Sequence, residues 1–196
     1  MSNSGNYTVT PQIIASGFHI LPEEPKQVGD VTSNARGSGA RFNSGKAPLD
    51  LIPLWIIANS FAGRVSDEAS RDVQKALYFL GEFQTTQNLE SLDRAIVQLR
   101  DYWSQAANVF DYGRRKYAEW NWAKGMAWSV PLACAARHAL NVLSDEEVTD
   151  SESGYAHVGH MLCNLVMLRT FYVSWPSGND LPKPELFTPP PVAPEF

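Results

Sequence analysis

Two helical patterns joined by a short acidic connector occupy residues 129–168, whose sequence is SVPLACAARHALNVLSDEEVTDSESGYAHVGHMLCNLVML. Apolar residues recur every three or four positions over 132–143 and again over 158–168, which is the spacing of one buried helix face. Asp150 or Ser151 is expected to cap the second helix. Because the connector SDEEVTD is short, the two helices are predicted to form an antiparallel hairpin.

The same helical periodicity extends upstream of the hairpin, back to Leu51. A short helix is expected after Pro53, and a second helix should end at Gly81. The most regular pattern runs from Leu89 to Phe110 and predicts one continuous helix. Since no alternation typical of a strand extends beyond a few residues, the sequence predicts an all-α fold.

The ends of the chain differ in composition from this helical body. The length of 196 residues fits one domain. Residues 1–39 are rich in Gly, Ser, Asn and Pro and predict an irregular arm, whereas 176–196 form a Pro-rich tail. The helical domain is therefore expected to span residues 40–175.

Composition and charge limit the classes of partner. The net charge of −5 argues against duplex nucleic acid as a partner, so a nucleotide would have to be bound by a few local cations and a divalent metal. No apolar stretch is long enough to span a membrane, and the N-terminus does not resemble a secretory signal. Cys134 and Cys163 lie in apolar runs and are expected to be buried thiols. These features predict a cytoplasmic protein with no membrane partner.

Polar residues follow one edge of the second hairpin helix. His157, His160 and Asn164 are spaced i, i+3 and i+7, so they fall within a narrow arc that borders the apolar face. Asp150 and Glu152 are expected at the N-terminal end of the same helix. Two interpretations are open: a site that binds metal or substrate, or a hydrogen-bonded helix interface with an acidic cap.

The preceding helix carries a complementary set. Arg137, His138 and Asn141 can face the second helix across the hairpin. Three of the four histidines of the chain are therefore expected in one hairpin, together with two carboxylates.

The segment GKAPLDLIP places Lys46 and Asp50 just before the first helix. The segment does not match a phosphate-binding P-loop, because Gly39 and Gly45 are one residue too far apart and Ala47 replaces the required hydroxyl residue. Lys46 could still bind a phosphate and Asp50 a metal or ribose. Alternatively, both are solvated residues at a helix entry.

The segment YGRRKYAEWNWAKGMAW, residues 112–128, mixes aromatic and basic side chains and is predicted to be an ordered loop. Tryptophan rings stack on bases and nearby cations bind phosphates, so the segment suits a nucleotide. Single-stranded nucleic acid would use the same chemistry. A Trp-rich corner of the core, with cations at its surface, is the alternative.

The motifs GKxxLDLIP, YGxxKYxxxNWxKGxxW, RHxL and DxESGxxHxxHxxxN occur in this order, and together they resemble the phage and bacterial dATP/dGTP diphosphohydrolase family. The resemblance spans residues 40–173. It implies a MazG-like helical bundle that hydrolyses dGTP or dATP to the monophosphate and pyrophosphate. In phages whose DNA contains 2-aminoadenine, such an enzyme supplies dGMP, and the location would be the host cytoplasm.

The resemblance also implies roles for individual residues in metal-assisted attack of water on the α-phosphorus. The catalytic candidates are Asp150, Glu152, His157 and His160. These four, with Asp50, are the candidate ligands of Mg²⁺ or Mn²⁺. The substrate-binding candidates are Lys46, Asp50, Lys116, Asn121, Trp122, Arg137, His138 and Asn164.

One departure from the MazG-like pattern concerns the metal ligands. MazG-like proteins usually bind magnesium through ExxE and ExxD motifs, but here His157 and His160 stand where an ExxD pair would lie, and no ExxE precedes them. Imidazole favours softer metals such as manganese, cobalt or zinc. A MazG-like hairpin usually completes its site by pairing with another subunit, which implies a homo-dimer or homo-tetramer. The competing hypothesis is a non-catalytic helical module that binds a nucleotide or a protein through the Trp-rich loop.

Overall fold

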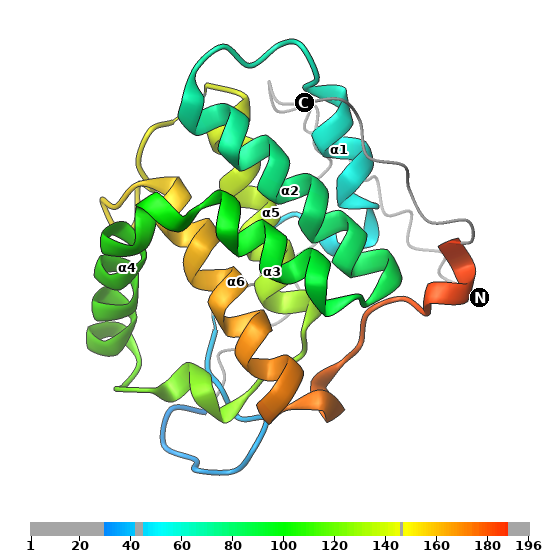
Figure 1. Ribbon diagram of the computed structural model, residues 1–196. Helices are drawn as coiled ribbons and strands as arrows, with labels where there is room; N and C mark the ends of the chain where they lie inside the picture. Colours follow the sequence, from blue (N-terminus) through cyan, green and yellow to red (C-terminus); the bar gives the residue numbers. More distant parts are fainter. Residues whose placement is uncertain (1–29, 42–44, 146, 188–196) are drawn as a thin grey trace, which may run out of the picture.

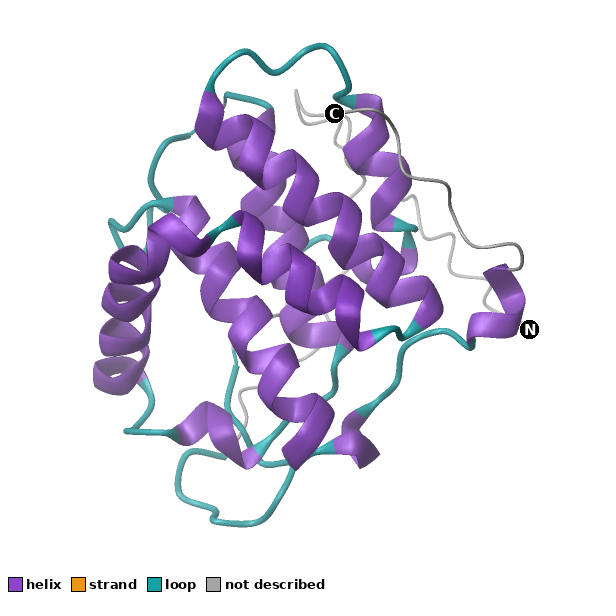
Figure 2. Cartoon of the chain, in the orientation of Figure 1, coloured by secondary structure: helices purple, strands orange, loops and turns teal. Residues whose placement is uncertain are grey.

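The computed structural model describes residues 30–41, 45–145 and 147–187, and over these ranges the chain is all-α with no β-strand, as predicted (Figure 2). Short 3₁₀ turns connect the helices. The α-helices are α1 (Leu54–Ser60), α2 (Glu68–Thr86), α3 (Leu89–Gln98), α4 (Trp103–Lys116), α5 (Ser129–Leu143) and α6 (His157–Ser174) (Figure 1).

Helix α6 lies at the centre of the bundle and packs against α3, α4 and α5. It is buried on almost every side, as expected for a helix surrounded by other helices. His138 in the second half of α5 contacts His157 at the start of α6, whereas Trp128, just before α5, donates a hydrogen bond to the carbonyl of Trp175, just after α6. The two helices therefore run antiparallel, as the connector predicted. Cys134 and Cys163 are buried free thiols, also as predicted.

Gly81 does not end α2, contrary to the sequence prediction, and the helix continues to Thr86. A Cβ atom at Gly81 would lie 2.1 Å from the backbone nitrogen of Trp55 and 2.8 Å from the carbonyl carbon of Leu54. Glycine is needed at this position because α1 and α2 touch backbone to backbone. Its role is close packing. A single sequence cannot distinguish a glycine needed for packing from one that ends a helix.

The long pattern from Leu89 to Phe110 is broken into α3 and α4, so the prediction of one helix was wrong. A 3₁₀ turn at Arg100–Tyr102 separates them, directly after the fully buried Leu99. The turn redirects the chain so that α4 packs on α6, where a Cβ at Gly159 would lie 2.8 Å from the backbone of Gln105. Tertiary packing has overridden local periodicity here.

Helix α6 begins at His157, so neither Asp150 nor Ser151 caps it. Asp150 instead organises the turn before the helix: its Oδ1 accepts a hydrogen bond of 2.9 Å from the backbone nitrogen of Ser153. The same turn is closed by backbone bonds of Asp150 to Tyr155 and Gly154. The carboxylate of Asp150 is thereby held in place by a turn and not by the first turn of α6.

The described part of the N-terminal arm packs on the loop after α4. The backbone nitrogen of Gly37 donates to the carbonyl of Lys124, and that of Gly39 to Gly125. Residues 1–29 and 188–196, where most of the predicted arm and much of the predicted tail fall, lie outside the described ranges. The described residues after α6 include two 3₁₀ turns. The domain boundaries at 39 and 175 stay predictions.

Membrane crossing requires a long apolar helix. Within the described ranges, no helix has that combination of length and hydropathy.

Candidate active site

A cavity of about 90 Å³ opens between α4, α5 and α6. The loop after α4 and the segment containing Arg41 and Lys46 complete its walls. Eight of the residues singled out in the sequence line it, namely Lys46, Lys116, Asn121, Trp122, His138, Asp150, Glu152 and His160. The three separate motifs of the sequence thus meet at one cavity.

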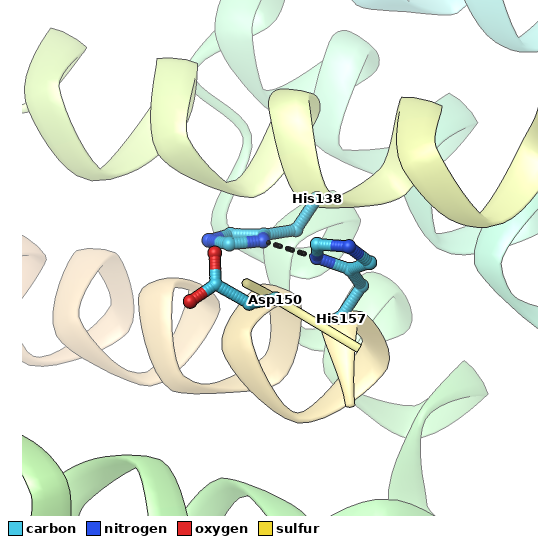
Figure 3. A group of neighbouring side chains, drawn as sticks. All are labelled: His138, Asp150 and His157. Carbon is cyan, nitrogen blue, oxygen red and sulfur yellow. Dashed lines mark hydrogen bonds between the residues drawn. The ribbon is translucent and has the colours of Figure 1, made fainter. Parts of the chain in front are cut away.

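Three histidines from the two hairpin helices lie in contact beside the cavity. Nδ1 of His138 lies 2.8 Å from Nδ1 of His157 (Figure 3). The other side of His157 faces Asn141, whose Nδ2 lies 3.2 Å from Nε2. The ring of His138 also stacks on His160, with centroids 4.4 Å apart and planes at 20°. This packing confirms that His138 and Asn141 face the second helix across the hairpin.

One group of side chains has the geometry to hold a cation. One ligand atom each from His138, Asp150 and His157 lies within 4.8 Å of the others (Figure 3). A site with two imidazoles and a carboxylate favours Mn²⁺, Co²⁺ or Zn²⁺ more strongly than a site made only of oxygen ligands does. His138 was expected to bind substrate, so the structure adds it to the candidate ligands.

Burial keeps two of these histidines neutral. Burial lowers the pKa of His160 to about 3, and neighbouring His138 adds to the effect. Burial also lowers the pKa of His157. Burial raises the pKa of Asp150, but hydrogen bonds from Ser153 outweigh that effect, and the pKa lies below its ordinary value. Near pH 7 His157 and His160 are therefore neutral and Asp150 is ionised, which is the state that metal binding requires of His157 and Asp150.

His160 and Ser153 form the inner polar wall. Nε2 of His160 lies 2.7 Å from Oγ of Ser153 and 3.8 Å from Oδ1 of Asp150. Ser153 therefore links the ring of His160 to the turn that holds Asp150. The link fixes both side chains relative to the cavity.

Lys116 and Glu152 form an ion pair on the cavity wall. Tyr112 donates a second hydrogen bond to the same carboxylate oxygen of Glu152, at 3.3 Å. The hydrogen bond from Lys116 holds the pKa of Glu152 below its ordinary value. The Glu152 side chain is half exposed, so this pair is accessible to an incoming anion.

The opposite wall is aromatic and contains an unsatisfied polar atom. The ring of Trp122 lies 5.3 Å from that of Phe110 and 5.9 Å from that of Trp120. Asn121 is buried, and its Oδ1 accepts no hydrogen bond within the described parts of the chain. A buried acceptor without a donor is costly, and at a cavity wall it is suited to an N–H group of a ligand. Trp120 just before it has a φ of 56°, a strained value for a bulky residue.

Four of the predicted site residues do not line the cavity. Asp50 lies in a 3₁₀ turn, where burial raises its pKa and Asp180 adds to that effect. Arg137 donates a hydrogen bond of 3.1 Å to the carbonyl of Ala47. His157 and Asn164 are buried behind the cavity-lining side chains. Asp50 is therefore not among the residues that this cavity brings together.

Arg41 is the cavity-lining residue that the sequence reasoning missed. Its Nη2 lies 2.8 Å from Sγ of Cys134 and 2.8 Å from Oδ1 of Asn164. Arg41 belongs to no periodic pattern, and its only sequence signal is its position four residues before the GKxxLDLIP motif. Only the tertiary structure brings Arg41, which follows the arm, to the cavity.

Residues 85–180 match a family model described as dATP/dGTP diphosphohydrolase, N-terminal. The matched segment contains α3 to α6 and all cavity-lining residues except three, Ala40, Arg41 and Lys46. No curated protein and no solved structure matches the chain. Residues 85–180 are thus similar to the dATP/dGTP diphosphohydrolase family, which is a family of enzymes.

Proposed function

We propose that the cavity is the active site of an enzyme that hydrolyses a purine deoxynucleoside triphosphate, dGTP or dATP, to the monophosphate and pyrophosphate. The observation that carries the proposal is the meeting of three chemistries at one cavity: cations, a His–Asp cluster and an aromatic wall with an unsatisfied amide oxygen. The family match supports a catalytic role over the alternative of a non-catalytic binding module.

The aromatic wall is assigned to the purine. Trp122 and Phe110 offer flat apolar surface on which a base can stack. Oδ1 of Asn121 can accept an N–H of the purine or a sugar hydroxyl, which would satisfy an atom that is buried without a donor. Both guanine and adenine carry such N–H groups.

The basic side of the cavity is assigned to the phosphates. Lys46 and Lys116 line it, and Lys116 can exchange Glu152 for a phosphate oxygen. Glu152 is itself half exposed, so its release into solvent costs little. The exchange would couple phosphate binding to a movement of the Glu152 side chain.

The residues present fit a divalent cation, Mn²⁺ or Mg²⁺, which His138, Asp150 and His157 would hold. When bound, such an ion offsets triphosphate charge and polarises the reacting phosphoryl group. His160 stays neutral near pH 7, so it can orient water or phosphate through a ring nitrogen without adding charge. Ser153 fixes the ring of His160 in that orientation. In the reaction, the oxygen of water forms a bond to the α-phosphorus. The bond between the α-phosphorus and the α–β bridging oxygen breaks, and that oxygen leaves as part of pyrophosphate.

Three further features belong to the same proposal. The helical bundle is assigned to the MazG-like type, in a cytoplasmic homo-dimer or homo-tetramer. The exposed apolar residues Leu51, Ile52 and Ile56 near α1 support burial against a second copy. In a phage with 2-aminoadenine DNA, the product dGMP would feed synthesis of the modified base.

The test is product analysis with labelled water. The protein is incubated with dGTP or dATP and Mn²⁺ or Mg²⁺ in H₂¹⁸O, and the products are separated and weighed by mass spectrometry. We expect the monophosphate and pyrophosphate, with the ¹⁸O in the monophosphate, and no turnover in EDTA. Release of orthophosphate with a diphosphate, or of inorganic triphosphate with a nucleoside, would overturn the proposal.

A further inference from the structure

Arg41 enters the cavity wall beside two sulfur atoms and an amide. Its Nη2 donates to Sγ of Cys134 and to Oδ1 of Asn164, both at 2.8 Å, and Nη1 lies 3.7 Å from Sδ of Met167. No Asp or Glu forms an ion pair with Arg41 over residues 30–41, 45–145 and 147–187. A thiol, a thioether and an amide are weaker acceptors for a guanidinium than a carboxylate or phosphate.

Burial opposes the shift, but Arg41 lowers the pKa of Cys134 well below its ordinary value, so this sulfur atom offsets part of the guanidinium charge. No carboxylate in the described ranges does so. Arg41 lines the cavity together with Lys46 and Lys116, whereas the described acidic residues that line it are Asp150 and Glu152. The three cations that line this wall suit an anion with several charged oxygens. A guanidinium binds two oxygens of a phosphate at once, which a lysine cannot do.

Asn164 aims the guanidinium. It is fully buried, and its Nδ2 donates a hydrogen bond of 2.7 Å to the backbone carbonyl of His160. This bond fixes the amide so that Oδ1 faces Arg41. Asn164 was expected to bind substrate, but it lies behind Arg41 and does not line the cavity. Its contact with the substrate is therefore indirect.

We propose that Arg41 forms an anion subsite of this cavity that binds phosphate oxygens of the nucleotide, with Asn164 as its positioning residue. The subsite deepens the proposed function and rests on it for the identity of the nucleotide. Binding of a phosphate would give Arg41 charge-assisted hydrogen bonds to oxygen, which are stronger than its contacts with sulfur. The amide of Asn164 holds the guanidinium in place without neutralising it.

The test measures binding separately from turnover. Inorganic pyrophosphate and dGMP are titrated into the protein in EDTA by calorimetry, which removes any contribution of a metal. Relative to wild type, R41Q should raise the Kd of at least one of the two ligands by about 10-fold or more, and R41K should raise that Kd less. The control R94Q removes an exposed arginine that pairs with Glu90 on α3, and it should bind as wild type does.

A second variant tests positioning. N164D places a carboxylate against Arg41, so Kd per folded molecule should rise as it does in R41Q. The melting temperature is measured separately, because N164D also removes the hydrogen bond to the carbonyl of His160. In turnover assays both variants should raise KM more than they lower kcat. A purely structural role of Asn164 would instead lower the melting temperature and leave Kd per folded molecule unchanged.

The outcomes separate this inference from the proposed function. Folded R41K and N164D proteins that bind pyrophosphate and dGMP with the wild-type Kd would overturn the subsite, even if wild type hydrolyses dGTP. Arg41-dependent phosphate binding by a protein that hydrolyses no deoxynucleotide would uphold the subsite and overturn the proposed function.

Discussion

Nδ1 of His138 lies 2.8 Å from Nδ1 of His157, so one proton is shared between two imidazoles at the interface of α5 and α6. With the amide nitrogen of Asn141 facing Nε2 of His157, the neutral His157 ring carries its proton on Nδ1 and donates it to His138. A metal ligand must give up the proton at its coordinating nitrogen. Binding of a cation at Nδ1 and this hydrogen bond are therefore mutually exclusive.

The first prediction concerns metal binding by this cluster. Mn²⁺ should raise the melting temperature of the wild-type protein, with about 2.7 kcal/mol of stabilisation when the free metal is 100 times Kd. D150N removes the carboxylate of the His138–Asp150–His157 group and should lose most of that increase. D111N is the control, because Asp111 pairs with Arg114 and Arg115 on the surface of α4. An equal increase in D150N and wild type would contradict the site.

The second prediction concerns acid stability. The pKa of His160 is about 3 in the folded protein against 6.5 for an ordinary histidine, so between these values the unfolded chain binds a proton that the folded protein does not. The free energy of unfolding should therefore fall as the pH drops from about 6.5 towards 3, and His160 should contribute about 1.4 kcal/mol of that fall per pH unit. Above pH 6.5 the titration of His160 should not change the free energy of unfolding. Urea denaturation at several pH values should give a flatter profile for H160Q. Parallel profiles for H160Q and wild type would refute the assignment.

The third prediction tests the backbone contact between α1 and α2. A Cβ at Gly81 would overlap backbone atoms that cannot rotate away, so G81A should lower the free energy of unfolding by about 3 kcal/mol or more. G113A is the matched control. Apart from its own stretch of helix, no atom of the described residues lies within 4 Å of a Cβ at Gly113, and alanine should stabilise α4 by about 0.5–1 kcal/mol. Chemical denaturation measures both, and a neutral G81A would contradict the contact.

The fourth prediction concerns the start of α5. Ser129 is the first residue of α5, and it donates its backbone N–H and its hydroxyl to the carboxylate of Asp180, at 2.8 and 2.6 Å. D180A should therefore cost about 0.5–2 kcal/mol, the range of a lost helix cap. E185A changes an exposed carboxylate in the same segment and should leave the melting temperature nearly unchanged. A D180A protein as stable as E185A would show that this cap contributes nothing.

Local sequence rules predicted the helical content and the hairpin because both depend on residues within a few positions of each other. The apolar spacing of α5 and α6 reports which side of each helix is buried, and it needs no knowledge of the partner. The same rules placed His138 and Asn141 opposite His157, because antiparallel helices joined by a short connector have few possible registers. The motif containing Lys116 and Trp122 was identified by composition alone.

Tertiary structure decided what periodicity could not express. Gly81 allows α1 to pack closely on α2, and the helix that ends near Leu99 is followed by a 3₁₀ turn. Both features depend on where another helix lies. The cavity joins Arg41 to His160 over 119 positions of sequence, and Asp50 stays outside it although its motif neighbour Lys46 lies inside. The spacing of residues along one helix fixes their relative directions, whereas distances between segments follow from how the segments pack. The sequence therefore identified most of the candidate side chains, and the packing of Arg41 and α4 beside the hairpin decided which of them line one cavity.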